Sequence, residues 1–414
     1  MRLTAHQEDM LGGKRGWPCQ IAMRLIAAVG RAQDADDLIP IGSVHLGLSG
    51  TSMSEPGMRF VEKLAGQGAR FVVPTTLNIL SFDRREVGAD PALRAQEDIQ
   101  WRIVKACEAM GGAPTFTCNP FQLGVRPRRG ESVAWNESAT APYVNAVLGA
   151  RTNREGASAL ASALTGHTAN YGMHLPRNRL GSQLVVVETP VSGADDFNLL
   201  GGAVARAAGP RIPVIEGIDR VPTEDEMTAL SAAFAGVSPL PMMHIVGVTP
   251  EAPTRADAMQ ADQALPAVAI GASALAAERR RYATARDDAV DVVAIGCPHA
   301  SFAQVGEVAD ALAGRSIAAD VRFYVQINRP CADRVEASGL AAKLGSAGVT
   351  LLSDSCVHVA YDQIPAGRTL ATNSLKIAYL IASHDVNVQF GNLQQCVDAA
   401  VAGRWIHGGT QSRA

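Results

Sequence analysis

Short apolar runs alternate along this chain with longer segments in which apolar residues recur every three or four positions. The runs with the length and β-branched content of buried strands are residues 39–46, 70–74, 184–188, 213–216, 244–248, 292–295, 321–327 and 349–352. The segments with helical periodicity or a high Ala content are residues 4–33, 58–65, 157–164, 304–313 and 334–344. This alternation predicts an α/β fold with mostly parallel sheets.

Two stretches of the chain interrupt this rhythm. Residues 209–223 are rich in Pro and Gly, and residues 252–266 read as a further connection. A chain of 414 residues is long enough for two or three lobes. We therefore expect soft lobe boundaries near these two stretches.

Composition and charge narrow the class of partner. The formal net charge is −3, and the two short basic runs, 126–129 and 279–281, are typical of solvated faces, so no nucleic-acid surface is expected. No apolar stretch reaches the roughly 18 residues that a membrane span needs. Residues 1–17 contain no apolar core of a signal peptide. These features predict a cytoplasmic protein.

Three of the seven cysteines stand in small polar settings that free the sulfur to point at a shared centre. They are Cys118 before Asn-Pro, Cys297 before Pro-His, and Cys356 after Asp-Ser. Cys297 and Cys356 each follow a predicted strand, where open α/β sheets build their sites. Their separation matches no zinc finger. A buried apolar cysteine is the alternative for any one of them, but together they predict an iron–sulfur cluster with one iron open as a Lewis acid for removing water from a hydroxy acid.

The loops after the first two predicted strands contain small and neutral polar residues. Residues 47–54 are mostly Gly and Ser, so their backbone N–H groups can approach a ligand closely. Thr75, Thr76 and Asn78 offer neutral donors and acceptors to a carboxylate or a hydroxyl. The alternatives are a flexible connection and a turn whose side chains bond their own backbone.

Charged candidates lie in two further segments. Glu137 and Ser138 precede the polar segment 149–156, in which Arg151 is suited to hold a carboxylate in a bidentate manner. Lys376 follows a polar turn and offers a point charge to an anion. An exposed helix-capping segment and an ordinary surface lysine are the alternatives.

Taken in order along the chain, these motifs resemble those of the aconitase X family over nearly its whole length. The segments that carry the resemblance include Val73–Asn78, Cys118, Gly149–Gly156, Gly296–His299 and Cys356. The resemblance implies aconitase-like, multi-lobed α/β/α layers with mostly parallel sheets around a central Fe–S cleft. It also implies that Cys118, Cys297 and Cys356 hold an iron–sulfur cluster of the 2Fe–2S or the 4Fe–4S form.

The family further implies a division of labour between two chains. Residues 1–414 look like the large, catalytic subunit, and the small swivelling domain, which is thought to carry the serine for proton transfer, is expected as a separate chain. Characterised members are hydro-lyases that dehydrate cis-3-hydroxy-L-proline or mevalonate 5-phosphate. On this basis the large subunit is expected to contact its substrate through Gly50, Thr51, Ser52, Asn78, Glu137, Ser138, Arg151 and Lys376.

The substrate and the activity itself leave alternatives open. Ile79, the pair Ala303-Gln304 and the loop 49–54 depart from the family pattern near the expected substrate site. We expect cis-3-hydroxy-L-proline or a related small 3-hydroxy acid, with mevalonate 5-phosphate as the alternative. A non-catalytic Fe–S or redox-sensing protein is an alternative of another class. A dinucleotide-dependent oxidoreductase is disfavoured because no GxGxxG opens a helix after a strand.

Overall fold

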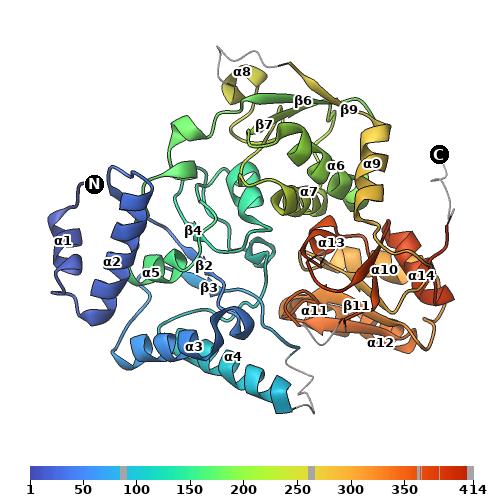
Figure 1. Ribbon diagram of the computed structural model, residues 1–414, viewed down its shortest axis with the longest axis horizontal. Coiled ribbons are helices and arrows are strands. Elements are labelled where there is room, and N and C mark those ends of the chain that lie inside the picture. The colour runs from blue at the N-terminus through green and yellow to red at the C-terminus, as the bar shows by residue number, and fades with distance from the viewer. Residues whose placement is uncertain (84–90, 260–265, 361–363, 365, 382, 408–414) are drawn as a thin grey trace.

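The computed structural model shows three α/β regions that follow one another along the chain (Figure 1). It describes the chain apart from residues 84–90, 260–265, 361–363, 365, 382 and 408–414. Each region contains a parallel sheet, and only the small β1–β5 pair is antiparallel among the paired strands of the described residues. The predicted α/β fold with mostly parallel sheets is therefore confirmed.

The first region surrounds a three-stranded parallel sheet of order β3-β2-β4. Its strands are β1 (Leu38–Pro40), β2 (Val44–Leu46), β3 (Thr75–Leu77), β4 (Ala134–Trp135) and β5 (His167–Ala169). Its helices are α1 (Ala5–Leu11), α2 (Trp17–Ala32), α3 (Gly50–Gly66), α4 (Pro91–Ala109) and α5 (Ser158–Thr165), with 3₁₀ turns η1 (Pro120–Leu123), η3 (Gly172–His174) and η4 (Pro176–Asn178) and a π turn η2 (Tyr143–Val147). α2 buries Met23 and Ile26 on the side that packs on α5, as its apolar spacing predicts.

The second region contains a four-stranded parallel sheet of order β8-β7-β6-β9. The strands are β6 (Gln183–Val187), β7 (Pro213–Glu216), β8 (His244–Ile245) and β9 (Val268–Ile270), and the helices are α6 (Gly193–Ala208), α7 (Glu224–Val237), α8 (Arg255–Ala258) and α9 (Ala272–Tyr282). The stretch 209–223, for which the sequence predicts a lobe boundary, contains β7, which lies between β6 and β8. The stretch 252–266 contains α8, and its residues 260–265 lie outside the described part.

The third region contains a five-stranded parallel sheet of order β12-β11-β10-β13-β14. The strands are β10 (Val292–Ile295), β11 (Arg322–Ile327), β12 (Val349–Ser353), β13 (Thr369–Thr372) and β14 (Asn387–Phe390). The helices are α10 (Phe302–Leu312), α11 (Arg329–Ala337), α12 (Leu340–Ser346), α13 (Leu375–Ile381) and α14 (Leu393–Ala402).

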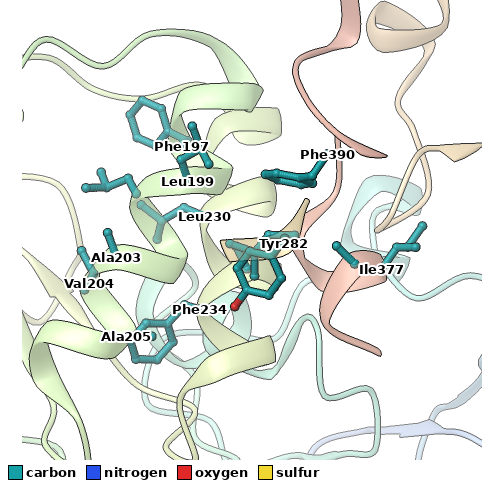
Figure 2. Close-up of a cluster of buried hydrophobic side chains, with 14 of the residues drawn as sticks. Phe197, Leu199, Ala203, Val204, Ala205, Leu230, Phe234, Tyr282, Ile377 and Phe390 are labelled. Carbon is teal, nitrogen blue, oxygen red and sulfur yellow. The ribbon is translucent and has the colours of Figure 1, made fainter. Parts of the chain in front are cut away.

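One hydrophobic core joins the second and third regions. Phe197 of α6 and Phe234 of α7 belong to the same buried cluster as Ile377 of α13 and Phe390 of β14 (Figure 2). Burial of a side chain of this size contributes roughly 1.5–3 kcal/mol. The shared core therefore fixes α6 against the turn that leads into α13.

Several local predictions require correction. The strand expected over residues 39–46 is two strands, β1 and β2, which belong to different sheets. The loop expected over residues 47–54 ends at Ser49, because α3 begins at Gly50. The strand expected over residues 70–74 is instead β3 at Thr75–Leu77, because β2 selects its neighbour by register, pairing Val44 with Thr75. The helix expected over residues 334–344 is two helices, α11 and α12, separated at Gly339, where φ is +77°.

Among the described residues, no helix is long and apolar enough to cross a membrane.

Candidate active site

The three predicted cluster cysteines line one cavity between the first and third regions. Cys118, Cys297 and Cys356 share the wall of a hollow of about 240 Å³. The segment after β3 closes one side of it, because Leu80 pairs with Ser355 and Asp83 accepts a hydrogen bond from the Ser353 N–H. The cavity therefore forms only where two sheets from distant parts of the chain meet.

Strand ends deliver most of the cavity wall. The parallel strands β2, β3 and β4 end at one edge, where they present Gly47, Asn78 and Asn136. β10 ends at Gly296 and Cys297 in the same way. Gly47 is required here because a Cβ atom would lie 2.1 Å from Asn136 Oδ1.

Buried hydrogen bonds fix the cysteine segments to one another. The His299 N–H donates to Cys118 Sγ over 3.2 Å, and Asn119 Nδ2 donates to the His299 carbonyl over 2.9 Å. The Gln326 side chain accepts from the Val357 N–H and donates to the Ile295 carbonyl. These bonds fix the loops that carry Cys118, Cys297 and Cys356 in position relative to one another.

The thiols of the three cysteines resist ionisation in the protein alone. Burial raises the pKa of Cys118 well above its usual range, that of Cys297 to about 12 and that of Cys356 to about 11. The charge of Glu137 raises all three further. A cationic group is therefore needed to make them thiolates, as a metal centre does.

The donor set suits a cluster better than a single ion. Among the described residues, no group of three or more His, Cys, Asp or Glu side chains is arranged to hold one metal ion. An iron–sulfur cluster is larger than an ion, and its cysteine ligands are distributed over two or more irons. Three thiols around one cavity, those of Cys118 and Cys356 buried and that of Cys297 half-buried, fit such a group.

A carboxylate faces the thiols from the first region. Glu137 Oε2 accepts from Asn78 Nδ2 over 2.7 Å, and its Oε1 accepts from the Ala139 N–H over 2.8 Å. His45 of β2 is fully buried, and its Nδ1 lies 2.9 Å from Thr76 Oγ1. Burial lowers the pKa of His45 to about 3. The ring is therefore neutral at pH 7, and it supports the site without adding charge.

A buried lysine faces the same cavity from the third region. Lys376 is 5% exposed, and its Nζ donates to Ser138 Oγ over 3.2 Å. Burial lowers the pKa of Lys376, while the charge of Glu137 raises it. The Lys376 ammonium and the Glu137 carboxylate are thus opposite charges in the lining of one cavity.

The structure gathers part of the expected substrate-contact set. Ser52, Asn78, Glu137, Ser138 and Lys376 line the cavity together with the three cysteines. Their contact with substrate stays a prediction.

Gly50, Thr51 and Arg151 are not among the residues that line it. The Gly50 N–H donates to Gln100 Oε1, and the Thr51 hydroxyl bonds the Ser49 hydroxyl. Arg151 forms a parallel backbone bridge with Ser132. Ser132 lies at the amino end of the segment whose carboxyl end carries Glu137. At about 3.3 Å per residue these ends are on the order of 15 Å apart.

Sequence reasoning missed several residues at the site. Ser49, Asn136 and His358 line the cavity, and the charge of Arg154 lowers the pKa of Lys376. Arg154 itself is anchored by Nη2, which donates to the carbonyls of Ala235 and Ser238. The position of His358, two residues after Cys356, was the available signal for it.

Comparison with known proteins matches this chain along nearly its whole length. Family models described as Aconitase X first, second and third domain match residues 1–177, 181–280 and 290–402. A cis-3-hydroxy-L-proline dehydratase of Hypocrea jecorina is 36% identical over 97% of this chain and 69% of the relative. The enzyme of that name from Pseudomonas aeruginosa is 34% identical over 97% of this chain and 70% of the relative.

Two further relatives come from archaea. The phosphomevalonate dehydratase large subunit of Aeropyrum pernix is 36% identical over 94% of this chain and 97% of the relative. The crystal structure of Thermococcus kodakaraensis aconitase X in its holo-form superposes with a TM-score of 0.85 at 30% identity, over 97% of this chain and 100% of that one.

Proposed function

The chain belongs to the aconitase X family, and from that premise we propose that it is the large subunit of a hydro-lyase acting on cis-3-hydroxy-L-proline. The relatives are named dehydratases, which are hydro-lyases. We further propose that Cys118, Cys297 and Cys356 hold an iron–sulfur cluster. When bound, the cluster supplies an iron that acts as a Lewis acid towards the leaving hydroxyl.

The charges that line the cavity are the observation on which we base the choice of substrate. Burial lowers the pKa of both His299 and His358 to about 4, so both are neutral at pH 7. Among the described lining residues, this leaves Lys376 as the cation and Glu137 as the carboxylate, while the charge of Arg154 acts on both from outside the lining. One charge of each sign complements a cyclic amino acid, which carries a ring ammonium and a carboxylate.

The chain's own side chains then bind and orient the substrate. Lys376 pairs with the substrate carboxylate, and Glu137, held by Asn78, pairs with the ring ammonium. Ser138 keeps the Lys376 ammonium in place through its hydroxyl. The reaction removes the hydroxyl from the carbon β to the carboxylate and the proton from the α carbon, and orientation of these two groups is what the paired charges provide.

A small subunit is part of this proposal. The relatives named large subunit, which this chain spans over nearly their full length, imply a small-subunit partner. We expect the base that takes the α proton to lie on that partner. The carboxylate that the described cavity offers, Glu137, already accepts hydrogen bonds from two donors.

Mevalonate 5-phosphate is the second candidate, favoured by the identity to phosphomevalonate dehydratase large subunits. A phosphate together with a carboxylate brings about three negative charges at neutral pH. In the described part of the cavity lining they meet the ammonium of Lys376 and the opposing charge of Glu137, with Arg154 as a further cation that acts on Lys376. Two cations and one carboxylate do not balance three negative charges, and this mismatch disfavours the phosphorylated acid.

The test uses the chain purified anaerobically together with its small subunit, assayed with both substrates. We expect a brown protein that dehydrates cis-3-hydroxy-L-proline, and a Cys297→Ala variant that is colourless and inactive. Cys331→Ala is the matched control, because Cys331 is a half-buried cysteine outside the cavity. Full activity of Cys297→Ala would refute the proposal, faster turnover of mevalonate 5-phosphate would establish the second candidate, and a brown complex inactive on both would favour a non-catalytic Fe–S protein.

A further inference from the structure

A second, smaller hollow lies behind Cys297, on the side away from the substrate cavity. This rear cavity has a volume of about 40 Å³, and its wall includes Asn198, Asp225, Thr228, Cys297, Gln304 and Ser374. It lies where α6 and α7 of the second region pack against the Cys297 loop of the third. Beyond it is an open surface groove of about 930 Å³, whose wall includes the first residues of α6, α7, α10 and α11.

Neighbouring hollows have lining residues in common: the substrate cavity with the rear cavity, and the rear cavity with the groove. The substrate cavity and the rear cavity have the segment 296–298 in common, so this loop forms part of the wall of both. The rear cavity and the surface groove have Ala194, Asp225 and Gln304 in common. The rear cavity therefore adjoins both the groove and the back of Cys297.

An unsatisfied hydroxyl marks the rear cavity as a site for water. Thr228 is 6% exposed, and its Oγ1 is buried with no hydrogen-bond partner among the described residues. A cavity needs at least about 10–15 Å³ and two to four polar partners to hold a water molecule. The volume exceeds this limit, and the carboxyl group of Asp225, of which one oxygen accepts from Ser301 Oγ, offers a second partner.

We propose that the rear cavity binds ordered water on Thr228 and connects the back of Cys297 with the surface groove. Water and other small neutral molecules then reach the back of Cys297 from the groove even when a partner covers the substrate cavity. The consequence of this access for a cluster held by Cys297 rests on the proposed function. The water site does not, because it follows from the cavity and the hydroxyl alone.

The first test concerns the water site. A high-resolution crystal structure of the full chain is expected to show water within hydrogen-bond distance of Thr228 Oγ1. Thr228→Val keeps the shape but removes the hydroxyl, so that water disappears and the Tm falls. Ser231→Ala is the matched control: Ser231 Oγ is also buried on α7 without a partner but lines neither the rear cavity nor the groove, so its removal is expected to raise the Tm. An empty site, with a Tm of Thr228→Val that rises as in Ser231→Ala, would overturn the proposal.

The second test concerns the passage. Ala194→Leu fills the mouth between the groove and the rear cavity, whereas Ala303→Leu enlarges a groove residue that does not line the rear cavity. Hydrogen peroxide, which resembles water in size, is added to each complex of large and small subunits, and loss of the visible colour is followed. We expect slower bleaching in Ala194→Leu only, and equal rates in both variants and the natural protein would refute the passage. Failure of the proposed function would show differently, as a protein that has no colour at the start, and the first test then still decides the water site.

Discussion

Asn198 of α6 is expected to hold the turn that positions Lys376, although it lies in another region of the protein. Its Oδ1 accepts from the Leu375 N–H over 3.1 Å, and its Nδ2 donates to the Asn373 carbonyl. Asp195, one turn earlier on α6, accepts from Asn373 Nδ2 over 2.9 Å. Replacing Asn198 with Leu keeps the size of the side chain but leaves one backbone donor and one backbone acceptor without these partners.

The size of the effect follows from burial. Asn198 is 7% exposed, and Leu375 is fully buried. A buried polar group that loses its partner costs about 1–3 kcal/mol, so two of them predict a loss of about 2–4 kcal/mol, allowing for partial access of water. Because Lys376 follows this turn directly, kcat/KM is expected to fall as well, mainly through KM, since the ammonium no longer stands opposite Glu137.

The free energy of unfolding is measured by urea titration at pH 7, with steady-state kinetics on the complete enzyme. Asn178→Leu is the matched control, because Asn178 also donates to a backbone carbonyl, that of Gly172, but is exposed. Its loss is expected to stay within about 0.5 kcal/mol. If Asn198→Leu were no more destabilising than this control, the reasoning from buried backbone groups would be wrong.

Three further outcomes are expected. Gly296→Ala places a Cβ atom 2.5 Å from a backbone oxygen at φ +93°, and we expect a loss of about 1–3 kcal/mol or more together with the cluster colour, whereas Gly306→Ala in open space on α10 should stabilise the protein in thermal unfolding. The pKa of Glu226 is lowered to about 2, chiefly by Arg220, so its contribution to folding stability is present above about pH 4.5 and is lost as the pH falls towards 2. Glu226→Gln should therefore reduce the free energy of unfolding by about 1–3 kcal/mol at pH 7 and by progressively less in acid. A difference in stability that did not depend on pH would contradict this. Lys376→Met should reduce transition-state stabilisation by about 2–5 kcal/mol in kcat/KM, with partial recovery in Lys376→Arg, and an unchanged kcat/KM would remove the lysine from the site.

Local sequence was sufficient for most of the strands and helices, and it singled out the three cysteines that the structure brings to one cavity. Strands such as β10 and β11 are short β-branched runs, and the helices between them have their own caps, as in Ser301 with Gln304 at the start of α10. These signals act within a few residues, so they can be read without the fold. The motif around Cys297 likewise carries its turn and the proposed cluster ligand in four consecutive residues.

Only the tertiary structure decided which residues face the cavity. Arg151 and Arg154 lie in one polar motif, yet only Arg154 influences Lys376, because an extended segment moves about 3.3 Å and turns to the other face with each residue. The strand near residues 70–77 was misplaced for a related reason: its register is set by pairing with β2, which lies about thirty residues earlier in the chain. The hydrogen bonds of Asn198 with the turn before Lys376, and the cavity that Thr228 and Cys297 both line, join segments that meet only when the sheets pack, so no local pattern encodes them.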